Sequence, residues 1–125
     1  MTLKVTGFKS TGATYKIVHD ADSITSGAPA LNEDVLGTSG KIYSIDITNS
    51  AGTHTSYTKF KLTSGTVTVG TTEPDMVILC GPSTSEQYQF PAGLDFTQLT
   101  FWTTRNGETA DATVPNSTVI NILCS

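Results

Sequence analysis

Hydrophobic and polar residues alternate along the middle of the chain, and this alternation predicts two paired β-strands. Residues 41–48 and 55–62 both show the two-residue period of a strand with one buried face. The side chains predicted to point inward are Tyr43, Ile45, Ile47, Phe60 and Leu62. Lys59 and Lys61 fall on the opposite face of the second strand, so we expect them to point into solvent. Residues 49–52 (NSAG) tolerate the conformations of tight turns, and the two strands are therefore predicted to form a β-hairpin.

Short β-segments are predicted on both sides of this hairpin. They are residues 2–8, 14–19, 66–69, 76–80, 85–90, 98–104 and 117–124. The apolar run Met76–Cys80 (MVILC) is expected to be covered on both faces. A corner is predicted at Pro91–Gly93, anchored by Leu94 and Phe96, and a tight turn at Arg105–Glu108, which contains Asn-Gly. Seven to nine such strands predict an all-β, single-domain antiparallel β-sandwich of Greek-key or jelly-roll type.

The chain has 125 residues, which suits one domain. Residues 1–40 are expected to supply N-terminal strands and an extended loop or arm, and residues 41–125 to form the core sandwich. Residues 20–40 are rich in polar and small side chains, which is typical of a long excursion over the surface. Within it, Ala30–Leu36 is a candidate for one short turn of helix. Long excursions of this kind are often functional, commonly as contact arms.

Charge and apolar run length argue against two classes of partner. The net charge is −4 and the seven basic residues are scattered, so no basic stripe can neutralise the phosphates of a nucleic acid. No apolar run approaches the roughly 20 residues that span a bilayer, and the first residues lack the apolar core of a signal peptide. We therefore expect no nucleic-acid or membrane partner, and folding in a reducing cytoplasm.

Cys80 and Cys124 both end apolar runs, MVILC and VINILC. We interpret them as small hydrophobic residues in or near the core, because free cysteine is among the most buried residue types and disulfides are rare in a reducing compartment. A disulfide between adjacent strand ends is the alternative. Two thiols without clustered histidines make a poor zinc site.

No catalytic or cofactor-binding motif is present in the sequence. His19 and His54 are the only histidines, and we interpret both as surface loop residues. The acidic groups at 20–22 and 32–34 lack the register and the bidentate Glu of a calcium loop, and are interpreted as solvated carboxylates. Phosphate-binding glycine loops and nucleophile elbows are also absent. The chain is therefore expected not to be an enzyme and to bind neither a metal nor a cofactor.

Two aromatic residues, Trp102 and Tyr57, are candidate contact residues. Trp102 is the only tryptophan and lies next to Phe101 on a Thr-rich strand. It has three interpretations: a core residue on the second face of its sheet, an anchor of a subunit interface, or a platform on which a sugar ring stacks. Tyr57 is a candidate for an interface residue or a sugar platform.

Four short segments occur in an order that resembles a known class of proteins. They are residues 45–49 (IDITN), 57–60 (YTKF), 69–75 (VGTTEPD) and 90–96 (FPAGLDF). With this order and spacing, residues 42–125 resemble the small β-sandwich virion structural proteins of tailed bacteriophages. Residues 1–40 depart from that pattern.

The resemblance implies a binding role without chemistry, as an outer-capsid cement or decoration protein that stabilises the assembled shell through non-covalent interfaces. The implied partners are the major capsid protein or other virion proteins, and further copies of the chain in a homo-oligomer. The implied location is the capsid exterior, after synthesis in the host cytoplasm. Two alternatives stay open: a tail, neck or fibre-base component of the virion, and a carbohydrate-binding module that contacts the host surface.

Overall fold

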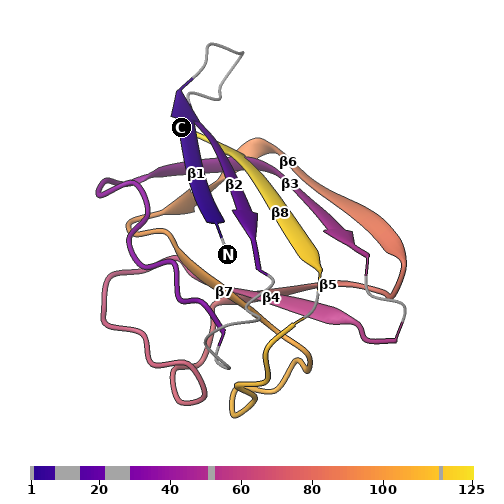
Figure 1. Cartoon of the computed structure of the whole chain (residues 1–125). Coiled ribbons are helices and arrows are strands. Elements are labelled where there is room, and N and C mark those ends of the chain that lie inside the picture. Colours follow the sequence, from indigo (N-terminus) through magenta and orange to yellow (C-terminus); the bar gives the residue numbers. More distant parts are fainter. Residues whose placement is uncertain (1, 8–14, 22–28, 51–52, 116) are drawn as a thin grey trace.

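The computed structural model describes residues 2–7, 15–21, 29–50, 53–115 and 117–125, which contain eight strands and no helix. The strands are β1 (Thr2–Gly7), β2 (Tyr15–Asp20), β3 (Gly40–Asn49), β4 (Ser56–Lys61), β5 (Met76–Cys80), β6 (Thr84–Phe96), β7 (Thr100–Thr104) and β8 (Thr118–Cys124). They form two antiparallel sheets, one of five strands in the order β1-β2-β8-β3-β6 and one of three in the order β5-β4-β7 (Figure 1). The expected all-β sandwich is confirmed.

Alternating side chains build the core between the two sheets. On β8, the buried residues are Thr118, Ile120, Ile122 and Cys124, and the residues between them are only half-buried. Ile45 and Ile47 of β3 are buried against the same core, as their spacing predicts. From the other sheet, Phe60 and Phe101 stack with 5.8 Å between their ring centroids. Removal of these apolar surfaces from water is the main driving force for the sandwich.

The predicted hairpin between residues 41–48 and 55–62 is wrong. β3 pairs with β8 and β6 in the five-stranded sheet, and β4 pairs with β5 and β7 in the other sheet. The chain therefore crosses from one sheet to the other between β3 and β4. Both strands still bury one apolar face, because two half-buried strands can face each other across a sandwich as well as lie side by side.

β6 continues through the predicted corner at Pro91–Gly93. Ser44 pairs with Gln89 and Ile42 with Leu94, so the register shifts between these two pairs. Such a bulge bends the strand locally without ending it. Proline is tolerated here because β6 is an edge strand. The same irregularity gives the inward position to Ile42 and leaves Tyr43 half-buried, contrary to its predicted inward orientation.

β5 is covered on one face only, contrary to expectation. Ile78 and Cys80 are buried, whereas Val77 and Leu79 are exposed. β5 lies at the edge of the three-stranded sheet. A continuous apolar run therefore does not prove that both faces of a strand are buried.

Loops add a third layer on the far side of the three-stranded sheet. Lys59 and Trp102 lie opposite each other on β4 and β7, on the face away from the core, yet they are 0% and 1% exposed. Segments 62–75 and 105–115 lie on this side of the sheet (Figure 1). The ammonium group of Lys59 donates a hydrogen bond to the carbonyl oxygen of Glu108 at 2.6 Å. The expectation that Lys59 points into solvent is therefore wrong.

The candidate helical turn at Ala30–Leu36 is also wrong, because its backbone bonds to a strand. Asn32 and Phe101 exchange two backbone hydrogen bonds of 3.0 Å, and the Val35 amide donates to the carbonyl oxygen of Leu99 at 2.9 Å. The segment thereby covers the edge of β7. A single helical turn provides too few internal hydrogen bonds to compete with such pairing.

Two short-range expectations in the loop layer fail as well. Residues 66–69 contain no strand. Arg105–Glu108 does not close a tight hairpin, since the Arg105 amide donates to the carbonyl oxygen of Thr113 at 3.3 Å and Gly107 lacks a positive φ. The Asn-Gly pair lies in a wider loop that covers Lys59.

Candidate functional site

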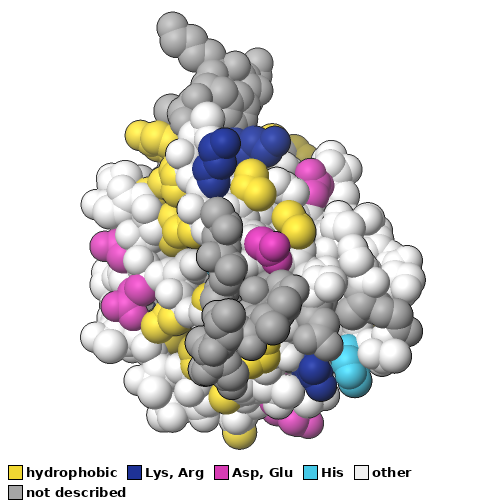
Figure 2. All heavy atoms as spheres, viewed as in Figure 1, with side chains coloured by type: hydrophobic (Ala, Val, Ile, Leu, Met, Phe, Trp, Pro, Cys, Tyr) yellow, Lys and Arg dark blue, Asp and Glu magenta, His cyan; other side chains and the backbone are white. Residues whose placement is uncertain are grey.

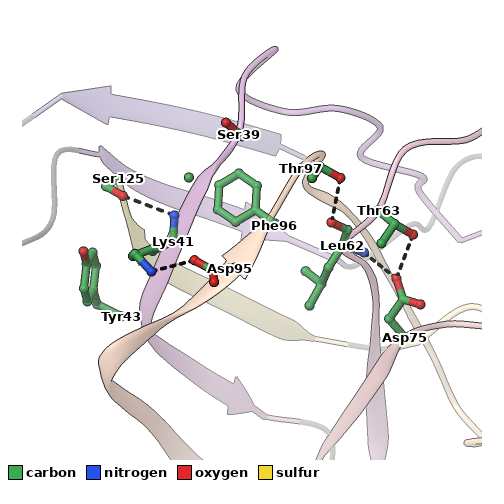
Figure 3. A pocket seen from close by; sticks show the side chains of 11 residues that line it. Ser39, Lys41, Tyr43, Leu62, Thr63, Asp75, Asp95, Phe96, Thr97 and Ser125 are labelled. Carbon is green, nitrogen blue, oxygen red and sulfur yellow. Dashed lines mark hydrogen bonds and ion pairs between the residues drawn. The ribbon is translucent and has the colours of Figure 1, made fainter.

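An open groove of about 800 Å³ lies at one end of the sandwich (Figure 3). One wall comes from the five-stranded sheet, with Lys41 and Tyr43 on β3 and Asp95 on β6. The other wall comes from Leu62, which follows β4, and Asp75, which precedes β5. The groove therefore joins residues that are distant in sequence and belong to both sheets.

Lys41 and Asp95 form the exposed polar side of the groove. They are direct partners in the β3–β6 ladder, and their side chains form an ion pair of 2.6 Å. The hydrogen bond and the charge of Asp95 raise the pKa of Lys41 above 10.5. Since both side chains are exposed, the pair contributes little to stability. It does place a cation and an anion where a ligand can reach them.

Asp75 is held firmly on the opposite side of the groove. Its carboxylate accepts hydrogen bonds from the Leu62 amide at 2.8 Å, the Thr63 hydroxyl at 3.3 Å and the Lys61 ammonium at 3.4 Å. Burial alone raises the pKa of Asp75, but these hydrogen bonds outweigh it, and the pKa lies below 3.8. Because its bonds tie the two ends of segment 62–75 together, Asp75 has a structural role.

A second hollow of about 460 Å³ lies on the outer face of the five-stranded sheet. It is lined by Lys16 from β2, Asn121 and Leu123 from β8, and Asp46 from β3. Asp46 and Asn121 are direct partners across the ladder. The Oδ1 atom of Asp46 is buried and has no hydrogen-bond partner among the described residues.

The described residues that line both cavities are charged, polar and apolar side chains. Within the part of the chain that the structure describes, no three His, Cys, Asp or Glu side chains lie close enough together to hold a metal ion. The groove lining contains no histidine or cysteine. What both cavities offer is hydrogen bonding by charged and polar side chains beside an apolar wall, which suits non-covalent binding.

Trp102 and Tyr57 lie outside both cavities. Trp102 is buried beneath the loop layer, so its ring presents no face to a ligand in this conformation. Tyr57 is half-buried on the same face of the three-stranded sheet and lines a third, polar hollow of about 430 Å³ with His54 and Arg105. The structure therefore does not place these two aromatic rings together on an exposed surface where a sugar ring could stack.

The two histidines have different surroundings. His19 is 2% exposed within β2, and its ring meets Phe101 edge-on at 5.7 Å, so its interpretation as a surface loop residue is wrong. An imidazole on the inward face of a strand packs as an aromatic residue. His54 is half-buried next to β4, and its carbonyl oxygen accepts a hydrogen bond from the Asn49 side chain at 2.7 Å.

The cysteines are free and buried, as their positions at the ends of apolar runs predict. Sγ of Cys80 lies 3.3 Å from the carbonyl oxygen of Thr84 and 3.6 Å from that of Ile47, so its single S–H group can donate to either one. Burial raises the pKa of Cys124 to about 11. Both side chains therefore act as small core residues.

Of the residues around 20–22 and 32–34, Asp22 lies outside the described residues. Asp20, Glu33 and Asp34 are exposed at the surface. Asn32 is 8% exposed and donates through its side-chain amide to the carbonyl oxygen of Phe101. Asn32 therefore joins a loop to β7 and is not a solvated loop residue.

The cavity residues were missed because their proximity depends on strand pairing. Lys41 and Asp95 are 54 positions apart in sequence and meet only through the β3–β6 register. Asp46 alternates with Ile45 and Ile47, which places it on the polar face of the strand, but no local pattern indicates that Asn121 and Lys16 line the same hollow. The alternating polar residues of β3 and β8 were the only available signal.

No protein-family model, curated protein or solved structure matches the chain significantly. Among the described residues, no helix has the length and apolar character needed to cross a membrane.

Proposed function

We propose that the chain is a bacteriophage virion structural protein that binds the outside of the assembled capsid as a cement or decoration subunit. The order of the segments IDITN, YTKF, VGTTEPD and FPAGLDF, which resembles that class, is one support. A second is the all-β sandwich, whose groove at Lys41 and hollow at Asp46 suit non-covalent binding. The partners in this proposal are the major capsid protein or other virion proteins, and further copies of the chain.

The placement of large apolar side chains at the surface carries the proposal. Leu3 and Val5 on β1 are each 41% exposed, and Val77 and Leu79 on β5 are 40% and 48% exposed. β1 and β5 are edge strands of different sheets, and apolar side chains gather at the surface over β1 and β2 (Figure 2). Exposed apolar groups on sheet edges favour contacts with other proteins. Two separate patches allow one subunit to contact two neighbours.

A capsid role gives these patches a physical function. A ligand that binds only the assembled shell stabilises the shell by mass action. Repeated weak contacts on a lattice add up to strong binding without a tight single site. The net charge of −4 also suits the outside of a capsid better than contact with the packaged genome.

Copy number per purified virion tests the proposal. Quantitative mass spectrometry against the major shell protein is expected to give a count equal to that protein or a simple fraction of it. A handful of copies would place the chain in the tail, neck or fibre base. Absence from virions would overturn the structural role altogether.

A surface variant tests the patch on β5. Val77→Ser combined with Leu79→Ser removes apolar area from exposed positions, so the fold is expected to survive. We expect less of this variant to co-sediment with assembled shells than of the unaltered protein. Thr71→Ala, an exposed change in segment 62–75, is the matched control and is expected to bind normally. Equal binding of all three proteins would exclude the β5 patch from the interface.

A further inference from the structure

The hollow on the outer face of the five-stranded sheet brings three kinds of hydrogen-bonding group together. Asp46 supplies a carboxylate, Asn121 an amide and Lys16 an ammonium group, and Leu123 adds an apolar wall. These residues come from three adjacent strands whose pairing fixes their order across the sheet. Asp46 and Asn121 are direct partners on adjacent strands, which lie about 4.8 Å apart, whereas Lys16 is the partner of Leu123 in the neighbouring row.

One carboxylate oxygen at this hollow lacks a hydrogen-bond donor. Oδ1 of Asp46 is buried and accepts no hydrogen bond from any described residue. Lys16 lines the same hollow, yet it forms no ion pair with Asp46 in the described part of the chain. Because an unsatisfied buried acceptor costs free energy, rotation of the Asp46 carboxylate toward a ligand that donates to this oxygen would be favourable.

The charges around the hollow indicate which net charge a ligand that donates to Asp46 should have. The carboxylate of Asp46 disfavours an anionic ligand, and the ammonium group of Lys16 disfavours a cationic one. A hydroxyl group both donates and accepts, so it can donate to Asp46 and accept from Asn121 or Lys16. A neutral ligand with several hydroxyl groups therefore matches all three side chains.

The surrounding face can extend such a contact. On β6, Gln87 is the direct partner of Asp46, on the side of β3 opposite to Asn121. The next pair along the same two strands is Ser44 and Gln89. Both glutamine side chains are exposed. These two exposed amide groups offer further hydrogen bonds to a ligand that runs across the strands.

We infer that this hollow, centred on Asp46 and Asn121, binds a neutral saccharide. The inference goes beyond the capsid role and stands whether or not the chain binds a shell. It also differs from a stacking platform at Trp102, because it uses hydrogen-bonding groups on the opposite sheet.

Nuclear magnetic resonance of the isotopically labelled full chain tests the inference. Maltotriose, cellotriose and triacetylchitotriose are the probes, each at millimolar concentration. We expect at least one of them to shift the amide signals of Lys16, Asp46 and Asn121. Asp46→Ala and Asn121→Ala are each expected to weaken that binding about tenfold, because each removes a hydrogen bond to the ligand.

Controls separate loss of the site from loss of the fold. Asp46→Ala removes a carboxylate with an unsatisfied buried oxygen, so its melting temperature is expected to equal or exceed that of the unaltered chain. Ser64→Ala, an exposed change in segment 62–75, is expected to bind as the unaltered chain does. No shifts with any probe, shifts confined to the groove at Lys41 and Asp95, or unchanged affinity in Asp46→Ala would overturn the assignment.

Discussion

At Lys59 the fold places an ammonium group beneath a loop. The side chain is buried, and Nζ donates to the carbonyl oxygen of Glu108 at 2.6 Å. Burial lowers the pKa of Lys59 below 10.5, although the charges of Asp111 and Glu108 oppose this change. The unfolded chain therefore binds this proton more tightly than the folded chain. As pH rises through the lowered pKa toward 10.5, this residue should therefore increase the free energy of unfolding, which means that the folded protein becomes more stable.

Lys59→Met tests this linkage, because methionine keeps much of the apolar stem and removes the titrating group. We expect the stability of the unaltered chain relative to Lys59→Met to increase between neutral pH and 10.5. Urea unfolding at a series of pH values measures this difference. Lys4→Met, at an exposed position on β1, is the matched control for the loss of one lysine charge. A pH-independent difference for Lys59→Met would contradict the lowered pKa.

The thiol of Cys124 is expected to be unreactive in the folded protein. Its pKa is raised to about 11, and the thiolate is the reactive form. Cys80 is buried as well. A colorimetric disulfide reagent at mildly alkaline pH is expected to detect no thiol in the native protein and both thiols in guanidinium chloride. Rapid reaction of either thiol without denaturant would contradict its placement in the core.

Among the elements, β6 depends most clearly on one backbone conformation. Gly93 has a φ of +83°, and a Cβ added there would lie 2.7 Å from Cδ of Lys41. Gly93→Val is therefore expected to reduce the free energy of unfolding by about 1–3 kcal/mol, because a β-branched residue is strained at this φ. Chemical denaturation measures the loss.

Gly37→Val separates backbone strain from the contact with Lys41. Gly37 also has a positive φ, of +68°, but nothing lies within 4 Å of a Cβ added there. Gly37→Val is therefore expected to reduce the free energy of unfolding by less than Gly93→Val does. Unchanged stability in Gly93→Val would show that β6 can adopt another path at this point.

Strand existence and orientation were largely predictable from sequence, whereas strand partners were not. Residues 41–48 and 117–124 show a local two-residue period, and Ile45 and Ile47 are buried as predicted. The same period does not specify which strand lies beside which, so the hairpin was predicted incorrectly. Lys59 does lie on the outer face of its strand, but distant loops decide its burial. The groove and the hollow also depend on pairing, so no local pattern could predict them.

At the scale of the whole molecule, two carboxylates organise the loops of the outer layer. Asp75 accepts a hydrogen bond from the Leu62 amide at 2.8 Å, and Asp111 accepts one from the Asn106 amide at 2.8 Å. For both, burial alone raises the pKa, but hydrogen bonds outweigh burial and hold the pKa below 3.8. The unfolded chain therefore binds these protons more tightly. The stabilisation is present above pH 3.8 and is lost as pH falls through the folded pKa values.

The melting temperature is accordingly expected to fall as pH is lowered from about 5 through the lowered pKa values of these carboxylates. The double variant Asp75→Asn, Asp111→Asn should be less stable at neutral pH, because an amide is a weaker acceptor than a carboxylate. It should also lose less stability on acidification, since the two linked protonations are gone. Thermal unfolding of both proteins across this pH range measures the effect. Parallel pH profiles would show that other carboxylates control the acid stability of the molecule.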